Sequence, residues 1–510
     1  MKRILSVLIC FTLLAGLLGC SRKVPAEEKT EPVSSSKSES QEQESPEQTG
    51  SSETQELTEE RTSAAPESLV QESSAPASSP EALASPMIPQ SPKREVLDSS
   101  GWKVVEKAES GSEYEDIHEM QEAQIAEYDE IRRSLPDFYA STIGEILGNA
   151  EGKNTVYSPV NVYLALSMLA EISDRESRAQ ILSLLGAGSI EELRDNAKML
   201  WHSNYIDDGY ATIALANSLW LQQGFPYQDE TVQRLASEYY ASVVRGMMGS
   251  SELNQMLQDW LNDNTGHLLE DSAQNIKTKP DTILALCSAI YFKAAWEDEF
   301  NEDLTRKGEV FHGRSDDYRC DYLISDEAGA ALFFGAHFTA YCRRMEDGNA
   351  MWFFLPDEDM SPEELSKDPE FQRFLQSDPY TEFRDQSGNY MLHVEIPKFD
   401  VNSDLDLIGT LKALGITDVF STEKADFSQI LTEDLEASVS EVQHAARVKI
   451  DEEGCEAAAY TVIMLEKAMM IQQDHADFIL DRPFLFAVRS YSGAVLFTGI
   501  VNEPGEKIAK

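Results

Sequence analysis

The sequence has few of the residues that enzymes and metal proteins use for chemistry. Only eight histidines and six cysteines occur in 510 residues, and no histidine lies near cysteines or carboxylates at a metal-ligand spacing. There is no glycine-rich phosphate loop, no G-x-S-x-G elbow, no H-E-x-x-H motif and no CxxC pair. His118 and Glu119 have no second histidine at helical spacing, so we interpret them as a solvated face. These absences give no support to a metalloenzyme or to a serine or cysteine hydrolase, and we expect no metal, no cofactor and no catalytic residues.

Basic residues are also scarce. The chain has 42 lysines and arginines against 90 aspartates and glutamates, a formal net charge of -48. Nucleic acids and anionic membrane surfaces both require a basic protein surface, so we expect no nucleic acid partner. No basic patch of the kind that binds glycosaminoglycans is visible, and we expect no activation by such a molecule.

A long hydrophobic run lies at residues 4–18, directly after Lys2 and Arg3. It is too short to span a bilayer comfortably but fits the core of a signal peptide. The run ends in LLGC at residues 17–20, which resembles a bacterial lipobox, where cleavage precedes the cysteine and the thiol carries the lipid. We therefore expect a lipoprotein signal peptide at residues 1–19, and an exported protein held on the outer side of a bacterial membrane by fatty acyl groups such as palmitate on Cys20. The alternative is a plain signal peptide followed by an incidental cysteine.

Aromatic residues and clusters of β-branched residues are nearly absent from residues 20–100, which consist mainly of Ser, Glu, Gln, Pro and Thr. Such a stretch cannot bury enough apolar surface to offset its ordering entropy, so we predict a disordered tether. As a flexible coil, its roughly 80 residues would have a root-mean-square span of about 50 Å. A spacer is the main interpretation, and binding of a partner is the alternative.

The remaining chain is interpreted as a partly helical lead-in at residues 101–134 and one large mixed domain at residues 135–505. Helical patterns and caps predict helices at residues 138–147, after the N-cap Ser158 and Pro159, from a capping box at 189–192, and at 404–414 before Gly415. Apolar runs predict strands at residues 154–157, 214–219, 285–292, 351–355, 391–396, 484–488 and 495–501. Helices and strands without regular alternation predict an α+β fold.

Four cysteines remain after removal of the signal peptide, namely Cys287, Cys320, Cys342 and Cys455. An exported protein can form disulfides. Cys287 lies in a predicted core strand and Cys455 in a predicted loop, so we expect free thiols there. The sequence leaves open whether Cys320 and Cys342 pair.

Residues 451–470 read DEEGCEAAAYTVIMLEKAMM and suit two different structures. The side chains alternate as in a strand with one wet face and one buried face, the latter beginning with Cys455. Gly454 and the three alanines nevertheless have weak strand propensity, and residues 469–477 form a polar run without a period. From these residues alone, an edge hairpin and a mobile loop are equally compatible.

Five motifs, taken in order, resemble the serpin family: NTVYSPV at residues 154–160, IYFKAAW at 290–296, IPKF at 396–399, LGITDVF at 414–420 and FILDRPFLFAV at 478–488. The resemblance covers residues 135–504 and implies the serpin fold, with three β-sheets, a helical N-terminal part and an exposed reactive loop at about residues 452–477. It also implies inhibition of serine proteases by a suicide-substrate mechanism. The protease cleaves the loop and forms an acyl-enzyme, and the cleaved loop then inserts as a new strand into the main sheet and distorts the protease's active site.

The same resemblance assigns roles to particular residues. The hinge, which enters the sheet first, comprises Glu452, Gly454, Cys455, Glu456, Ala457, Ala458 and Ala459. Small side chains suit this movement, because bulky ones would stall insertion into a close-packed interior. Cys455 and the outward-facing Tyr460 depart from the family's usual hinge residues.

The shutter, where the family's main sheet parts, comprises Ser158, Asn161, Ser288 and His444. Here asparagine stands at 161 where the family usually has serine, and serine stands at 288 where it usually has asparagine. The exchange would conserve the hydrogen-bonding groups. The alternative for His444 is an ordinary core histidine.

The family's spacing predicts the scissile bond. Fourteen positions after the hinge glycine Gly454 comes Ala468, so cleavage is expected between Ala468 and Met469. A count backward from Pro483, using the length of the shortest reactive loops in the family, places the residue before the scissile bond at Gln472 instead. We prefer the count from the hinge, because the inserted length decides how far the protease is carried.

The residue before the scissile bond selects the target. Ala468 in the primary pocket predicts elastase-like or subtilisin-like serine proteases. Cleavage between Lys467 and Ala468 would instead suit trypsin-like enzymes, and cleavage between Met469 and Met470 would suit chymotrypsin-like ones.

We thus expect a monomeric protease inhibitor, not an enzyme, that holds serine proteases as covalent acyl complexes, with some cysteine proteases as a second target class. The rival hypothesis is a non-inhibitory binding or surface protein of the serpin fold, whose loop is only cut. The small residues at 457–459 favour the inhibitor, because non-inhibitory members tend to carry bulky or charged hinge residues.

Overall fold

The computed structural model describes residues 5–11, 79–86, 88, 112–207, 211–268, 274, 276–433, 436–455 and 474–508, which belong to the same structural unit. The described α-helices are α1 (Ser112–Ile131), α2 (Pro136–Leu147), α3 (Pro159–Ile172), α4 (Arg175–Leu185), α5 (Ile190–His202), α6 (Asp229–Glu238), α7 (Ser251–Asn264), α9 (Pro362–Leu365), α10 (Pro369–Gln376), α11 (Pro379–Glu382) and α12 (Ile408–Ala413). Short 3-10 helices occur at Glu302–Leu304, Glu346–Gly348, Arg384–Gln386 and Asp418–Phe420. None of the helices in the described ranges is long and apolar enough to cross a membrane.

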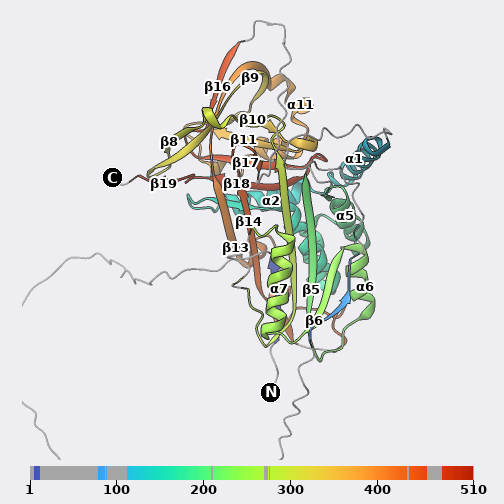
Figure 1. Ribbon diagram of the computed structural model, residues 1–510. Helices are drawn as coiled ribbons and strands as arrows, with labels where there is room; N and C mark the ends of the chain where they lie inside the picture. Colours follow the sequence, from blue (N-terminus) through green and yellow to red (C-terminus); the bar gives the residue numbers. More distant parts are fainter. Residues whose placement is uncertain are drawn as a thin grey trace, which may run out of the picture. The chain divides into compact units, whose positions relative to one another are not determined.

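The first sheet, which we call sheet A, contains nine of the described strands. Its order is β13 (Asp400–Asp406), β14 (Ala437–Lys449), β1 (Leu5–Phe11), β7 (Thr282–Ala295), β5 (Thr212–Gln222), β6 (Ala241–Gly246) and β2 (Glu81–Ala84), with β4 (Ile206–Asp207) on β5 and β15 (Gly454–Cys455) on β7. The first nine residues of β7 are all buried, as predicted for a central strand covered on both faces. Helix α7 crosses in front of this sheet and α6 lies at its β6 edge (Figure 1).

The second sheet, sheet B, contains ten of the described strands. Its order is β16 (His475–Ile479), β12 (Ser387–Pro397), β9 (Asp317–Phe334), β10 (Phe338–Arg344), β11 (Ala350–Pro356), β17 (Phe484–Arg489), β18 (Val495–Val501) and β3 (Thr155–Tyr157), with β8 (Arg306–His312) and β19 (Glu506–Lys507) on β9. The 18-residue strand β9 pairs with four others. It thereby joins these strands into one hydrogen-bonded sheet, so the described strands form two large sheets where the resemblance implied three.

Helix α3 is the buried helix that the sequence predicts. Ser158 is its N-cap and accepts a hydrogen bond from the backbone N–H of Asn161, and Pro159 occupies the first turn. All of its residues are buried, because it packs against both β7 and β18. The cap thus fixes the point at which this helix meets the two sheets.

Two local predictions were wrong in part. Residues 404–406 belong to β13 rather than to a helix, because they pair antiparallel with β14. Helix α12 begins only at Ile408 and ends before Gly415, which has a φ angle of +98°. At the predicted capping box, Ser189 does accept from the N–H of Glu192. The Glu192 carboxylate, however, accepts from Gly188 N–H at 2.8 Å rather than from the cap residue itself.

The N-terminal region contributes more structure than the sequence predicts. In the lead-in, α1 buries Tyr128 and Ile131, so the packed core begins before residue 135. Within the predicted tether, Glu81–Ala84 forms strand β2 at the edge of sheet A. Strand β2 gains its structure from a distant partner, whereas α1 lies in the lead-in that the sequence predicts to be partly helical.

Candidate functional site

The predicted hinge begins in a tight turn after β14. The Asp451 carboxylate accepts hydrogen bonds from the N–H groups of Glu453 (3.0 Å) and Gly454 (3.2 Å), which reverses the chain. The indole N–H of Trp296, which follows β7, donates to the Asp451 carbonyl at 2.9 Å, and its backbone N–H donates to the Glu453 carbonyl at 2.9 Å. The turn is therefore fixed to the end of β7.

The carboxylate of Glu452 is the charged anchor of this turn. It accepts hydrogen bonds from Lys398 Nζ at 2.6 Å and from Thr305 Oγ1 at 2.8 Å. Partial burial disfavours the charged form of Glu452, but these hydrogen bonds outweigh it, and the pKa of the carboxyl lies below its ordinary value. Sequence reasoning did not single out Lys398, Thr305 or Trp296, although Lys398 and Trp296 stand inside the quoted motifs.

The first loop residues already pair with sheet A. Gly454 lies opposite Ala295 and Cys455 opposite Ala294, antiparallel to β7, and Cys455 also bridges Ile450 at the end of β14. A Cβ atom at Gly454 would lie 2.4 Å from the Ala294 carbonyl oxygen, so only glycine allows this approach. Cys455 is 3% exposed, which agrees with its predicted inward parity.

The four predicted shutter residues lie together and are all buried. Ser158 N–H donates to His444 Nε2 at 3.0 Å. Asn161 Nδ2 donates to the Ser288 carbonyl at 3.3 Å, and the Ser288 hydroxyl donates to Asn161 Oδ1. The asparagine and serine that are exchanged relative to the family's usual arrangement therefore bond each other directly.

Burial also sets the charge of the shutter. Complete desolvation lowers the pKa of His444 to about 3, so the imidazole is neutral at physiological pH. A neutral ring can accept the hydrogen bond from Ser158 N–H, whereas an imidazolium cannot. The site is thus a neutral, hydrogen-bonded contact between α3 and the two strands β7 and β14.

These two strands are separated by the width of one strand. β1 lies between them, with Phe11 opposite both Ser288 of β7 and His444 of β14, and is parallel to each. Its residues 5–11 belong to the predicted signal peptide, a contribution to the sheet that the sequence analysis did not anticipate. The position between β7 and β14 at the shutter is thus occupied by β1.

Several predicted residues lie outside the described part of the chain. They are Cys20, Glu456, Ala457, Ala458, Ala459, Lys467, Ala468, Met469, Met470 and Gln472. The described chain resumes at Asp474, and β16 begins at His475 and pairs parallel with β12. Within the predicted loop of residues 452–477, the described residues 452–455 and 475–477 pair with or hydrogen-bond to other parts of the chain.

No disulfide joins the four cysteines considered above, Cys287, Cys320, Cys342 and Cys455. Burial raises the pKa of the Cys320 and Cys342 thiols to about 12, so both are protonated and unreactive at neutral pH. The pairing that the sequence left open is absent from the described structure.

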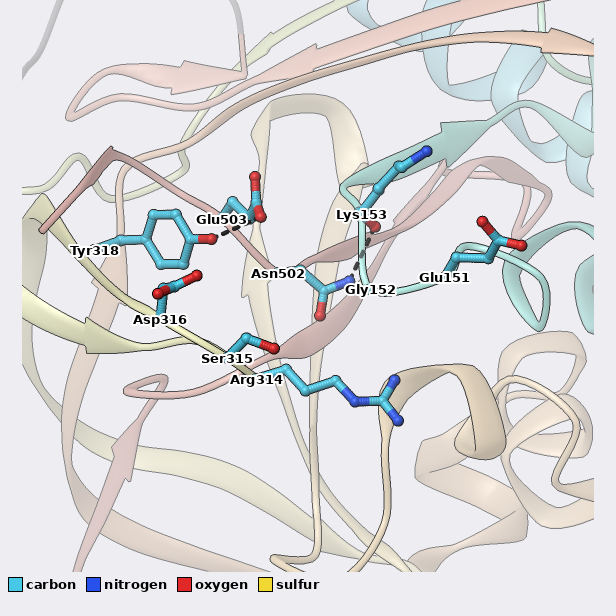
Figure 2. Close-up of a pocket in the computed structure, with 9 residues that line it drawn as sticks. All are labelled: Glu151, Gly152, Lys153, Arg314, Ser315, Asp316, Tyr318, Asn502 and Glu503. Carbon is cyan, nitrogen blue, oxygen red and sulfur yellow. Dashed lines mark hydrogen bonds between the residues drawn. The ribbon is translucent and has the colours of Figure 1, made fainter. Parts of the chain in front are cut away.

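A polar cavity of about 370 Å³ lies near the ends of β18 and β9. Figure 2 shows Tyr318 donating to Glu503 (2.6 Å) and the Asn502 side-chain amide donating to the Lys153 carbonyl (2.9 Å) across it. No predicted site residue lines this cavity. Among the described residues, no group of histidine, cysteine, aspartate and glutamate side chains is arranged to hold a metal ion.

The fold and this hinge-and-shutter arrangement define a class of protein. Residues 134–504 match the family model described as "Serpin (serine protease inhibitor)". The chain therefore belongs to the serpin family, a family of protease inhibitors rather than of enzymes.

Individual relatives and solved structures agree with this assignment. Serpin-ZX of Arabidopsis thaliana is 25% identical over 370 residues, which cover 70% of this chain and 93% of the relative. Human neuroserpin is 24% identical, with 73% of this chain and 91% of the relative covered.

Among solved structures, the thermophilic serpin tengpin in its native state has a TM-score of 0.63 and 24% identity, covering 72% of this chain and 94% of that one. Human thyroxine-binding globulin in its thyroxine complex has a TM-score of 0.63 and 21% identity, covering 74% and 100%. At these identities the structures establish the fold alone.

Proposed function

We propose that the protein is a suicide-substrate inhibitor of elastase-like or subtilisin-like serine proteases, cleaved between Ala468 and Met469. The observation that carries this proposal is the start of a new strand at the hinge. Gly454 and Cys455 already pair antiparallel with β7, beside the end of β14. Because the cleaved loop would continue in the same direction, insertion needs no reversal of the chain after cleavage.

The register at the hinge supports the predicted bond. Cys455 lies opposite Ala294, so an unbroken antiparallel ladder would bring Thr461 opposite Ser288 at the shutter and Lys467 opposite Thr282, the first residue of β7. Ala468 would then arrive just beyond the far end of this 14-residue strand, about 45 Å from the hinge. Cleavage after Gln472 would instead leave five residues, 468–472, beyond the end of β7 without a partner in that strand.

The direct test is incubation of the secreted chain with elastase, followed by a denaturing gel and mass spectrometry. We expect a stable covalent complex and a released peptide that begins at Met469. Cleaved protein beside fully active protease would overturn inhibition, whereas a peptide with a different first residue would overturn only the assignment of the bond.

A matched pair of variants tests insertion itself. Ala457→Arg places a long charged side chain on the face predicted to enter the sheet, and it should convert the inhibitor into a substrate because insertion stalls. Ala458→Arg introduces the same group one position later on the outward face, and it should leave most of the covalent complex intact. Inhibition that survives Ala457→Arg would contradict the insertion mechanism.

The second candidate is a non-inhibitory binding protein of the serpin fold. Thyroxine-binding globulin, a protein of the same fold named for the hormone in its complex, is the observation that motivates it. The elastase experiment separates the candidates, because a binding protein would be cut without trapping the protease.

We further propose export and lipid attachment at Cys20, with the inhibitor on the outer side of a bacterial membrane. The LLGC sequence after the hydrophobic run supports this assignment. Metabolic labelling with an alkyne fatty acid should mark the wild-type chain but not Cys20→Ser. Equal labelling of both would contradict the assignment.

A further inference from the structure

A short segment of the predicted tether adds a strand to the outer edge of sheet A. β2 pairs antiparallel with β6, with Glu81 opposite Arg245 and Ala82 opposite Val244. Arg245 Nη2 donates to the Glu81 carboxylate at 2.7 Å. We call residues 80–84 the clip. They lie outside the family match, which begins at residue 134, so the clip is an addition to the serpin domain.

The clip also buries apolar groups. Leu83 and Ala84 are half-buried and pack against the main hydrophobic core. Pro80 lies against Gly246, where an added Cβ atom would be 3.3 Å from the Pro80 Cβ. Backbone pairing, an ion pair and apolar contact thus combine in five residues, which is more than an incidental crossing of the chain would provide.

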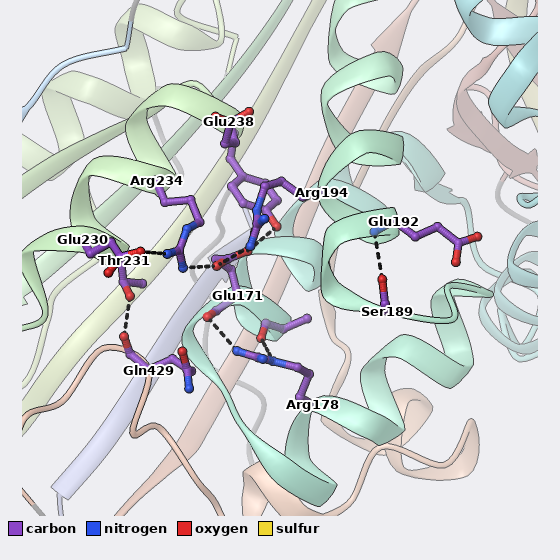
Figure 3. A network of polar contacts seen from close by, with 12 residues as sticks. Glu171, Arg178, Ser189, Glu192, Arg194, Glu230, Thr231, Arg234, Glu238 and Gln429 are labelled. Atoms are coloured by element: carbon purple, nitrogen blue, oxygen red, sulfur yellow. Dashed lines mark hydrogen bonds and ion pairs between the residues drawn. The ribbon is translucent and has the colours of Figure 1, made fainter.

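The surface that receives the clip is firmly held. Its strand β6 directly follows α6, and Arg234 of α6 donates to the Glu171 carboxylate at 2.8 Å. Figure 3 shows that Arg194 of α5 also donates to this buried carboxylate of α3, at 3.0 Å. The Tyr239 hydroxyl donates to the same carboxylate at 3.0 Å. Three helices are therefore tied together behind the clip, so its position is fixed relative to the sheet.

The clip lies at the end of sheet A that is remote from the hinge. Gly246, beside Pro80, pairs with Gln222 of β5, and the preceding Leu221 pairs with Leu284 near the start of β7. The hinge pairs with the other end of β7, at Ala295. The two points are about 40 Å apart, because some 12 residues of β7 separate them at roughly 3.4 Å per residue. Figure 1 shows β2 as the blue arrow beside α6, far from β16.

Without the clip, the chain would leave the domain from α1, at the opposite end. Gln124 of α1 donates to the Tyr205 carbonyl at 3.0 Å. The next residue, Ile206, pairs with Ile213, which pairs with Phe292 near the hinge end of β7. The clip therefore moves the point where the tether leaves the domain from the hinge end of the sheet to the far end.

We propose that the clip orients the anchored inhibitor, so that the reactive loop points away from the membrane and toward proteases arriving from solution. This inference rests on the proposed lipid anchor and reactive loop. As a flexible coil, the roughly 60 residues between Cys20 and Pro80 would span about 40 Å. That span is similar to the roughly 40 Å across the sheet, so the exit point decides whether the loop faces the bilayer or the surroundings.

Hydrogen exchange tests the clip itself in the full chain beginning at Ser21. Amides of residues 81–84 should exchange at least about tenfold more slowly than those of an unstructured peptide. The double variant Ala82→Pro with Leu83→Asp should abolish this protection, because it removes a backbone donor and buries a charge. The matched control, Ala64→Pro with Leu69→Asp, makes the same changes elsewhere in the tether and should preserve it. Unprotected residues 81–84 in the wild type would overturn the proposal.

Energy transfer tests the orientation. The same chain, with an N-terminal histidine tag, is bound to phosphatidylcholine vesicles that contain nickel-chelating and acceptor-labelled lipids. A donor dye is placed either on Asp281→Cys at the far end of sheet A or on Asp474→Cys at the loop end, both exposed positions. We expect transfer from position 281 to exceed that from position 474 by about twofold or more, and the clip-breaking variant to remove this difference while the control retains it.

Equal transfer from both positions in the wild type, or a difference that persists after the clip is released, would overturn the proposal. Neither protease nor the natural lipid takes part in these measurements. Failure of the inhibitory mechanism or of lipid attachment at Cys20 would therefore be detected separately and would leave this result unchanged.

Discussion

The two sheets bury their central strands in different ways. In sheet B, every residue of β18 and all of β17 except Arg489 are buried, and most of them are large and apolar. Sheet A is equally buried at the shutter, but there Ser288 of β7 and His444 of β14 face small polar groups of α3. Both sheets are held by apolar contacts, but sheet A also has a small hydrogen-bonded polar cluster at the shutter.

This difference explains how one molecule can be stable and still able to change its structure. Apolar contacts are lost outright when close-packed strands separate, because nothing replaces them. Hydrogen bonds at the shutter can instead be exchanged for those of an incoming strand at a small net cost. Sheet B would thus remain intact during the insertion that we propose for sheet A.

The largest expected effect comes from opening a cavity in sheet B. Phe486→Ala should lower the free energy of unfolding by about 3–5 kcal/mol, because the ring is fully buried and packs 5.1 Å (centroid to centroid) from Phe399. Thermal and urea unfolding followed by circular dichroism measure this loss. The control Phe334→Ala removes a ring that is 43% exposed and should cost much less. Equal losses in the two variants would remove the contrast between the sheets.

The next effect tests the exchanged pair at the shutter. Asn161→Ser or Ser288→Asn alone should each cost about 2–3 kcal/mol, because the first leaves a buried polar group without its partner and the second overpacks the contact. The double variant restores the family's usual arrangement and should recover most of the loss. Unfolding of all four chains gives a double-mutant cycle, in which we expect a coupling free energy of at least about 1 kcal/mol. Simple additivity would mean that the two side chains do not act as a pair.

The features that the sequence predicted well have local causes. Ser158 and Pro159 define the start of α3 without reference to the rest of the chain, and the apolar run of β7 identifies a strand buried on both faces. The shutter residues and the hinge glycine were found through family motifs. Gly454 has a direct physical reason for its identity, since a side chain there would collide with Ala294.

The features that the sequence missed depend on distant partners. Residues 81–84 read EALA, a helix-forming composition, and become a strand only because β6 supplies an edge more than 150 residues away. Leu405 lies in a stretch that fits a helix by pattern but pairs with His444 of β14. The Lys398 and Thr305 contacts of Glu452 join positions 54 and 147 residues apart. No window of sequence contains both members of these pairs.

Acid should weaken the shutter more than sheet B. The pKa of His444 is about 3 in the folded protein because of burial, against an ordinary 6.5. Since the folded pKa is depressed, the unfolded chain binds the additional proton first, and the stability contributed above pH 6.5 is lost as the pH falls toward 3. We expect about 2 kcal/mol to be lost between pH 7 and pH 5 at about 1.4 kcal/mol per pKa unit.

The measurement is the pH dependence of urea unfolding for the wild type and His444→Gln. The variant keeps an acceptor for Ser158 N–H but cannot titrate, so its stability should change less over this range. His393 provides the opposite case, because hydrogen bonds from its ring to Asp326 and Glu395 raise its pKa. The variant His393→Gln should therefore not flatten the acid loss. If His393→Gln reduces the loss of stability in acid to the same extent as His444→Gln, the shutter is not the origin of that loss.

The smallest predicted effect lies at the hinge. Glu452→Gln keeps the side chain's size but removes its charge opposite Lys398, and should cost about 1 kcal/mol at pH 7, because Lys398 is 32% exposed and solvent screens the pair. Burial opposes the charge of Glu452, but hydrogen bonds from Lys398 and Thr305 prevail and lower its pKa. The stability that the carboxylate adds is therefore present above its unfolded pKa near 4.5 and is lost as the pH falls through the folded value.

The difference between wild type and Glu452→Gln should accordingly disappear near pH 3, whereas Glu358→Gln, at an exposed position, should show none at either pH. Glu452→Gln also loosens the turn that aligns Gly454 with β7. The fraction of elastase trapped by this variant should therefore fall further than the small change in stability suggests. A variant with reduced stability but unchanged trapping would show that the anchor supports the fold without guiding the loop. That outcome would mean that the hinge, like sheet B, contributes only to the stability of the fold, whereas the shutter takes part in the structural change.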